Sequence, residues 1–146
     1  MGFFDPIDAS ASALTAERMR MDVVAENLAN AQTTRGADGT PYKRKSVVLQ
    51  QISESGTSFD ALLGKQMSKS SHGVEVTGIS EDTTPGKRVY DPGHPDADKD
   101  GYITLPNVNS VTEMVDLITA QRAYESNVTA MQTAKTMFAR TLDILR

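Results

Sequence analysis

Bulky apolar side chains recur at alternating intervals of three and four residues along roughly the last quarter of the chain. This pattern constrains the fold more than any other feature of the sequence, because it places one apolar stripe along a single helix, as in the seam of a coiled coil. No Gly or Pro occurs after residue 106. The sequence therefore predicts one helix over residues 107–146, and its stripe consists of Met114, Leu117, Tyr124, Val128, Met131, Phe138, Leu142 and Leu145.

The ends and flanks of this predicted helix carry further signals. Ser110 and Glu113 have the spacing of a capping box, and Pro106 lies just upstream, where it does not interrupt the helix. A second row of mostly small residues widens the stripe, so that one partner helix would leave part of it uncovered. The row consists of Ala120, Ala123, Asn127, Ala130, Ala134, Met137 and Ile144.

A second heptad pattern occupies the amino-terminal part of the chain. Asp5 and Pro6 are a favourable helix start, and the apolar residues Ile7, Leu14, Met21 and Leu28 follow at intervals of seven. Low helix propensity from Asn30 onward predicts that the helix ends between Asn30 and Thr34. We expect the two terminal helices to pack together as an antiparallel coiled coil.

The middle of the chain has a different pattern. Residues 42–52 are typical of a strand, 73–80 and 87–90 of the two strands of a hairpin, and 101–105 of a last short strand. Residues 53–72 are rich in Ser and Gly and predict a mobile loop. The expected fold is mainly α with a small β insert: residues 1–35 form the first helix and its turn, 36–106 the insert, and 107–146 the second helix, which completes one core domain with the first.

Composition excludes several classes of function. The net charge of −4 gives no basic excess for nucleic acid or for insertion into an anionic membrane. The absence of Cys removes disulfides and thiolate metal sites, and no apolar run reaches the length of a membrane span. The first ten residues, MGFFDPIDAS, lack the pattern of a cleaved secretory signal. We found no catalytic motif and expect no cofactor.

One local motif suggests a metal. Residues 96–104, DADKDGYIT, fit the first nine positions of an EF-hand calcium loop, but the twelfth position holds Asn107 instead of a bidentate Glu. Pro95 and Gly93 also exclude the entering helix. We therefore interpret this segment as an Asp-rich turn before a strand. The two histidines, His72 and His94, have no further ligands at metal-site spacing.

A short basic run, Lys43 to Lys45, is the remaining local signal. Three charges on one predicted strand are typical of a solvated edge, which also discourages pairing with other strands. We therefore expect these side chains to be exposed.

Two segments carry a resemblance to a known family. Residues 26–36, ENLANAQTTRG, resemble the asparagine-rich signature after the first helix of bacterial flagellar rod and hook proteins; Gln32 and Arg35 depart from its commonest form. Residues 107–127, NVNSVTEMVDLITAQRAYESN, resemble the carboxy-terminal signature of the same family. The central segment 85–98, PGKRVYDPGHPDAD, and the short chain are similar to a rod member in particular.

This resemblance implies an axial structural protein of the flagellar basal body, not an enzyme. Such proteins leave the cytoplasm through the flagellar type III export apparatus without a cleaved signal, and they assemble in the periplasm into the proximal rod, the drive shaft that transmits torque. The implied partners are copies of the chain, other rod proteins, the junction of membrane ring and export gate, and the distal rod. The two apolar stripes, with Asn27 and Asn30, form the expected assembly interface.

Two other functions remain open at this stage. A coiled-coil adaptor or secretion accessory protein would use the same stripes for one soluble partner in a finite complex. A calcium-responsive module would use residues 96–100 and would change on adding calcium. The family signatures favour the rod subunit.

Overall fold

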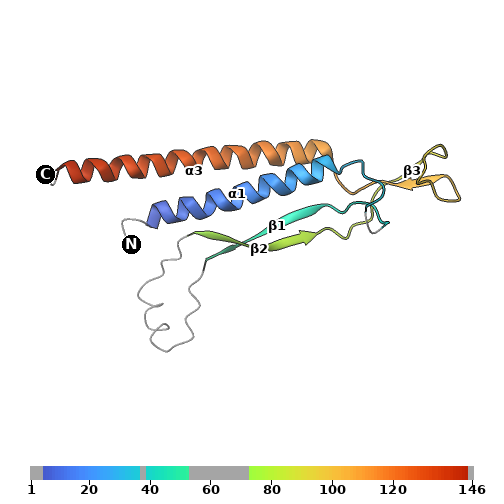
Figure 1. Ribbon diagram of the computed structural model, residues 1–146, viewed down its shortest axis with the longest axis horizontal. Coiled ribbons are helices and arrows are strands. Elements are labelled where there is room, and N and C mark those ends of the chain that lie inside the picture. The colour runs from blue at the N-terminus through green and yellow to red at the C-terminus, as the bar shows by residue number, and fades with distance from the viewer. Residues whose placement is uncertain (1–4, 37–38, 53–72, 145–146) are drawn as a thin grey trace, which may run out of the picture.

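The computed structural model describes residues 5–36, 39–52 and 73–144. Two helices, α1 (Asp5–Ala29) and α3 (Ser110–Ile144), lie side by side and run in opposite directions (Figure 1). Four strands lie between them in the sequence: β1 (Lys45–Gln51), β2 (Val74–Glu81), β3 (Arg88–Tyr90) and β4 (Tyr102–Thr104). The mainly helical fold with a small β part is confirmed. The predicted loop 53–72 lies outside the described residues.

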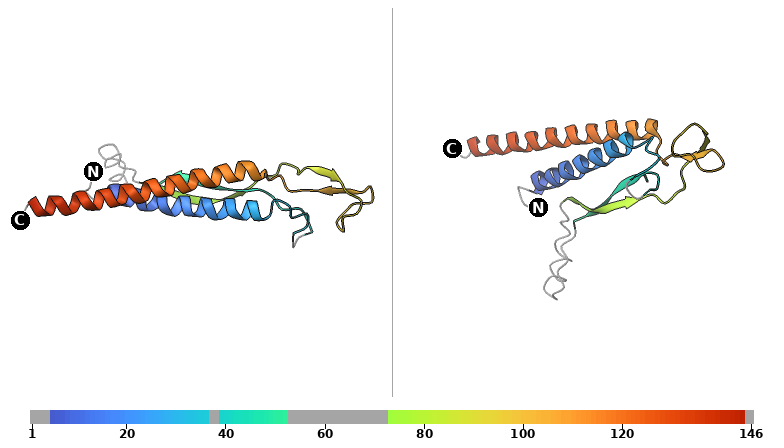
Figure 2. Two further views of the ribbon diagram at one scale, coloured as in Figure 1. Left: turned by 90° about the horizontal axis from the view of Figure 1, so that it is seen from above. Right: turned by 45° about the vertical axis from the view of Figure 1, so that its right-hand side comes forward.

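The elements form three layers with α1 in the middle. One side of α1 contacts α3 and the other contacts β1 and β2, as Figures 1 and 2 show. The buried apolar residues on the helices are Ala16, Val23, Val24 and Ala120. The β3–β4 hairpin extends beyond the helices at the end where α1 ends and α3 begins.

The pairing of the strands differs from the sequence prediction. β1 pairs with β2, and β3 pairs with β4, both antiparallel, so the predicted hairpin between residues 73–80 and 87–90 is wrong. Each observed pair covers an apolar side chain on both of its strands. Val47 on β1 and Val76 on β2 are half-buried within the sheet that contacts α1, whereas Val89 pairs with the buried Ile103 of β4.

The ends of both helices have clear physical causes. Asn30 donates its side-chain amide to the carbonyl of Glu26 and accepts a hydrogen bond from Thr33, which closes α1 one residue earlier than the predicted range. At the start of α3 the cap is Asn109, whose side-chain oxygen accepts from the backbone N–H groups of Val111 and Thr112. The predicted Ser110–Glu113 capping box is therefore wrong.

Gly86 offers a test of the β3–β4 hairpin. A Cβ at this position would overlap the backbone carbonyl of Leu105. The N–H of the same Leu105 donates to the Lys87 carbonyl. We expect Gly86→Ala to lower the free energy of unfolding, measured by urea denaturation, by about 1–3 kcal/mol, because the backbone must shift. Gly78→Ala is the control, since nothing lies within 4 Å of its added Cβ. Equal stability of the two variants would contradict the close approach.

Candidate assembly interface

Asn27 is at the centre of a polar cluster where α1, β1 and α3 meet. Its side chain is fully buried and makes four hydrogen bonds. The amide nitrogen donates to the Lys45 carbonyl at 2.8 Å and to Glu113 Oε2 at 3.0 Å. The amide oxygen accepts from Tyr42 Oη and from the Lys45 N–H, each at 2.9 Å. Every hydrogen-bonding position of this amide is used, so only Asn matches both its donors and acceptors.

Glu113 supplies a buried negative charge to the same cluster. Its side chain has no exposed surface, and its Oε1 accepts a hydrogen bond from Arg44 Nε at 2.6 Å. The hydrogen bond to Glu113 raises the pKa of the Arg44 guanidinium above its ordinary value. Arg44 Nη2 also donates to Asp116 Oδ2 at 3.4 Å. The backbone N–H of Arg44 donates to Asn107 Oδ1 at 3.0 Å. The buried carboxylate is thus paired and hydrogen-bonded, which is the condition for its stability.

Lys45 and the adjacent Tyr42 also take part in contacts within the chain. Lys45 Nζ lies 2.6 Å from Glu26 Oε1, and this hydrogen bond raises the pKa of Lys45. Burial, with the nearby Glu26 carboxylate, raises the pKa of the Tyr42 hydroxyl. The prediction of a solvated edge is therefore wrong for Arg44 and Lys45, whereas Lys43 is exposed. We call Asn27, Tyr42, Arg44, Lys45 and Glu113 the Asn27 cluster. Their contacts hold the end of α1 against the start of α3.

Most residues of the two predicted apolar stripes are half-buried. On α1, Ile7, Leu14, Met21 and Leu28 are half-buried. On α3, the half-buried residues share one side of the helix with the fully buried Glu113 and Ala120, at alternating spacings of three and four. These half-buried residues of α3 are Leu117, Tyr124, Val128, Met131 and Phe138.

Two residues of the predicted stripe on α3 differ from the others in burial. Met114 is exposed, because Glu113 takes the inward position through its bonds to Asn27 and Arg44. Leu142 is also exposed, but for a different reason, since α1 has 25 residues and α3 has 35. Leu145 lies outside the described residues.

The difference in helix length leaves the carboxy-terminal part of α3 beyond α1, as Figure 1 shows. The bond between Asn27 and Glu113 sets the register. Because both helices rise equally and run in opposite directions, Asp5 lies about level with Lys135. Leu142 is roughly 10 Å further along the axis. This extension carries an apolar side chain that α1 does not cover.

A surface that our sequence analysis missed lies on the first turns of α3. Val111, Met114, Val115 and Ile118 are all exposed large apolar residues. They follow the spacing i, i+3, i+4 and i+7, which places them on one face. The signal was present in the sequence, but the longer stripe of the opposite face obscured it.

The Asp-rich turn forms contacts of its own. Asp96 Oδ2 accepts a hydrogen bond from Thr34 Oγ1 at 2.8 Å, and Oδ1 lies 3.7 Å from Arg35 Nη1. Its backbone N–H donates to His94 Nδ1. These bonds attach the loop between β3 and β4 to the segment that follows α1. In the described part of the chain, no group of three or more His, Cys, Asp or Glu residues is arranged to hold a metal ion.

Calcium titration tests the interpretation of this turn. We expect calorimetry to detect no binding tighter than about millimolar, because Asp96 already has partners and the twelfth-position carboxylate is missing. A saturable micromolar site that disappears in Asp96→Ala would refute this expectation. Magnesium at the same concentration serves as the control for general screening of the acidic residues.

Segments at both ends of the chain match family models of flagellar basal-body rod proteins. A family model described as "Flagella basal body rod protein" matches residues 7–37, and one described as "Flagellar basal body rod FlgEFG protein C-terminal" matches residues 99–144. The chain is 48% identical to the flagellar basal-body rod protein FlgC of Bacillus subtilis strain 168, with 99% of each chain covered. The chain belongs to the FlgC family of flagellar basal-body rod proteins.

FlgC proteins of other bacteria are also similar to the chain. The protein of Borreliella burgdorferi is 41% identical, with 100% of this chain and 99% of the relative covered. The protein of Salmonella typhimurium is 40% identical, with 99% and 98% covered. The family is one of structural rod proteins and not of enzymes, so this chain is a structural subunit of the flagellar basal-body rod. No helix in the described residues is long and apolar enough to cross a membrane.

Proposed function

We propose that the chain is a subunit of the proximal rod, in which α1 and α3 pack as an antiparallel coiled coil and join neighbouring subunits through their remaining apolar surface. The observation that carries this proposal is the position of the two matched segments. They are far apart in the sequence, yet the first contains most of α1 and the second contains β4 and α3, and the two helices lie side by side. The alternating spacing along α3 supports coiled-coil packing.

In this proposal the terminal segments form one core domain and residues 36–106 form an insert. The Asn27 cluster supports this division, because it links the start of the insert to both helices. The subunit leaves the cytoplasm through the flagellar type III apparatus and assembles in the periplasm. Its partners are further copies, other rod proteins, the junction of membrane ring and export gate, and the distal rod.

The proposed assembly residues divide into two groups. One group stabilises the subunit itself: Leu117, Tyr124, Val128, Met131 and Phe138 with Ile7, Leu14, Met21 and Leu28 are half-buried, and Asn27 is fully buried. The second group is available to neighbours and includes Met114 and Leu142, each about half exposed. A rigid pair of helices with exposed apolar ends suits a shaft that transmits torque.

Leu142→Asp separates assembly from folding. We expect motility and incorporation into purified basal bodies to be lost, because a carboxylate would enter an apolar contact between subunits at a cost of several kcal/mol, by rough estimate. The isolated variant should unfold within about 0.5 kcal/mol of the parent chain, since Leu142 is 51% exposed. The experiment uses a strain in which this chain restores motility.

Thr141→Asp is the matched control for this substitution. Thr141 is exposed, and its hydroxyl is bonded to the Met137 carbonyl of its own helix. We expect Thr141→Asp to retain motility. Normal incorporation of Leu142→Asp would refute an assembly role for the extension of α3, and a finite complex with one soluble partner would favour the adaptor alternative.

A further inference from the structure

Residues 88–104, which comprise β3, β4 and the loop between them, form a unit that we call the arm. At the start of the loop, the Asp91 N–H donates to the Gly101 carbonyl at 2.9 Å. On the two strands, the rings of Tyr90 and Tyr102 meet edge to face with their centroids 5.2 Å apart. These contacts lie within the arm and hold its strands and loop together as one body.

The arm stands apart from the other elements. It extends beyond the helices at the end where α1 ends and α3 begins (Figure 1). Among the described residues, neither helix and neither strand of the other sheet contacts β3 or β4. Residues 82–87 connect the arm to β2, and residues 105–109 connect it to α3. A body that joins the rest of a protein through two short connections can turn about them, as in hinge motions.

One side chain attaches the arm to the segment that follows α1. Asp96 Oδ2 accepts a hydrogen bond from Thr34 Oγ1 at 2.8 Å, and Asp96 Oδ1 lies 3.7 Å from Arg35 Nη1. In the described part of the chain, every hydrogen bond and ion pair between the arm and another segment ends on Asp96. A hydrogen bond to an ionised carboxylate is stronger than one between neutral groups. Asp96 therefore restrains the arm.

His94 holds Asp96 in place for this contact. The Asp96 N–H donates to His94 Nδ1 at 3.1 Å, and the His94 N–H donates to the Asp91 carbonyl at 3.3 Å. The Asp96 side chain is 26% exposed, so most of the carboxylate is shielded from water. Because the bonds of His94 lie within the arm, they fix Asp96 relative to the arm and leave its attachment to α1 to Asp96 alone.

The direction of the arm determines where an aromatic surface points. Tyr90 is 63% exposed and Tyr102 is 40% exposed. The guanidinium carbon of Arg88 lies 5.0 Å from the centroid of the Tyr102 ring. Tyr and Arg are enriched among the residues that dominate binding at protein interfaces. A turn of the arm would carry this surface with it and would require no change in α1 or α3.

We infer that the arm is a hinged element and that Asp96 is its latch. The bonds to Thr34 and Arg35 hold the arm in the orientation of Figure 1. When they are lost, the arm turns about residues 82–87 and 105–109, and the population shifts between orientations of one fold. This inference does not depend on the proposed function, because it concerns a movement within one subunit.

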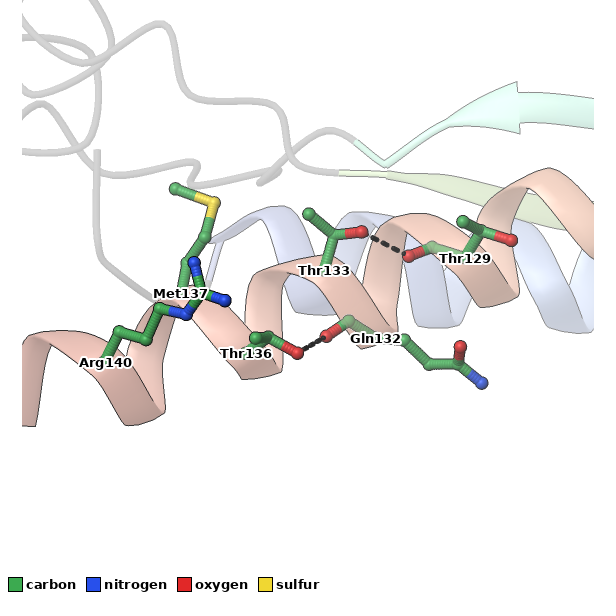
Figure 3. Close-up of a pocket in the computed structure, with 6 residues that line it drawn as sticks. All are labelled: Thr129, Gln132, Thr133, Thr136, Met137 and Arg140. Atoms are coloured by element: carbon green, nitrogen blue, oxygen red, sulfur yellow. Dashed lines mark hydrogen bonds between the residues drawn. The ribbon is translucent and has the colours of Figure 1, made fainter.

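Distance measurements by double electron–electron resonance on the purified full chain test the latch. The chain has no Cys, so spin labels attach only at cysteines that are introduced for the purpose. One label is at Lys99→Cys, which is exposed on the arm, and the other is at Thr129→Cys on α3 or at Asp22→Cys on α1. Thr129 lies on the exposed face of α3 that Figure 3 shows, and its hydroxyl donates to the Glu125 carbonyl of its own helix. Two reference sites are needed, because a turn can leave one distance unchanged.

We expect a narrow distance distribution in the labelled parent chain and a roughly twofold wider one in Asp96→Ala from at least one reference site, because the arm is released. Thr34→Val should have the same effect, although Thr34 is 62 residues away in the sequence, since it removes the donor and leaves the arm unchanged. Asp91→Ala is the matched control. It removes another carboxylate of the same loop, but the bond of that carboxylate to the Gly93 N–H stays within the arm, so the parent distribution should be kept.

Hydrogen exchange shows whether the released arm stays folded. The Asp98 N–H donates to the Tyr102 carbonyl and the Gly101 N–H to the Asp98 carbonyl, so both amides should stay protected in every variant. Unchanged distributions in both Asp96→Ala and Thr34→Val, or an equally wide distribution in the parent chain, would overturn the latch. A wide distribution with loss of protection at these amides would mean that the arm unfolds instead of turning, and would overturn the hinge.

Discussion

Replacing Asn27 with alanine is expected to lower the free energy of unfolding by about 3–5 kcal/mol. The substitution removes the partners of Tyr42 Oη, of the Lys45 N–H and carbonyl, and of Glu113 Oε2. Each buried polar group left without a partner costs about 1–3 kcal/mol, and water that enters the space recovers part of that loss. Chemical denaturation followed by circular dichroism measures the change. Incorporation into basal bodies should fall with stability.

Asn27→Asp gives a sharper version of the same test. The new carboxylate oxygen would replace the nitrogen that now lies 3.0 Å from Glu113 Oε2, so two carboxylates would face each other in a buried site. Burial and the like charge would raise the pKa of the new Asp above its unfolded value of about 3.9. The native state then binds more protons than the unfolded state, so stability decreases as pH rises. The deficit relative to the parent chain should grow from about pH 4 to pH 7.

Asn127→Ala is the control for both substitutions at Asn27. Asn127 is half-buried on α3, and its amide donates to the Ala123 carbonyl of its own helix. Because alanine has higher helix propensity, stability should stay within about 1 kcal/mol of the parent chain. If Asn27→Ala were as mild as Asn127→Ala, or if the deficit of Asn27→Asp did not depend on pH, the Asn27 cluster would have no structural importance.

The parts of the fold that sequence analysis predicted are those in which local pattern and tertiary contact agree. The spacing of Leu117, Tyr124 and Phe138 fixed the inner side of α3 because apolar residues on a helical period lie on one side whatever covers them. The turn after α1 was predicted from the low helix propensity of the residues from Asn30 onward, and Asn30 indeed closes the helix. Strand positions followed from β-branched residues in the same way.

The predictions that were wrong depend on contacts between residues that are distant in the sequence. Glu113 has the correct spacing for a capping box, but its carboxylate gains more from Arg44, 69 residues away, than from a local N–H. Because Glu113 points inward, the neighbouring Met114 is exposed. The pairing of β1 with β2 was missed for a similar reason. Residues 53–72 separate the two strands in the sequence, and the local turn signal after β2 favoured pairing of β2 with β3. The family signature pointed to Asn27, but neither pattern nor composition showed that its side chain would be buried within the subunit.

Arg44→Met is expected to lower the free energy of unfolding by about 3–5 kcal/mol, because it removes the cation from a carboxylate that is completely buried. Among the described residues, the Glu113 side chain would then keep only its hydrogen bond from Asn27. Methionine preserves most of the side-chain length, so the loss reports the charge and its hydrogen bonds more than the packing. Lys45→Met is the neighbouring control. Its ion pair with Glu26 is more exposed, and its loss should cost no more than about 1 kcal/mol.

The double variant Arg44→Met with Glu113→Gln completes the test. A neutral amide at position 113 no longer needs a cation, so the double variant should be more stable than Arg44→Met alone, although Gln must still occupy a fully buried polar site. The coupling energy from the four proteins should be about 1–3 kcal/mol, as for residues of one buried network. Additive losses would show that the two side chains act independently. In that case the 2.6 Å contact between Arg44 Nε and Glu113 Oε1 would not be what joins the insert to α3.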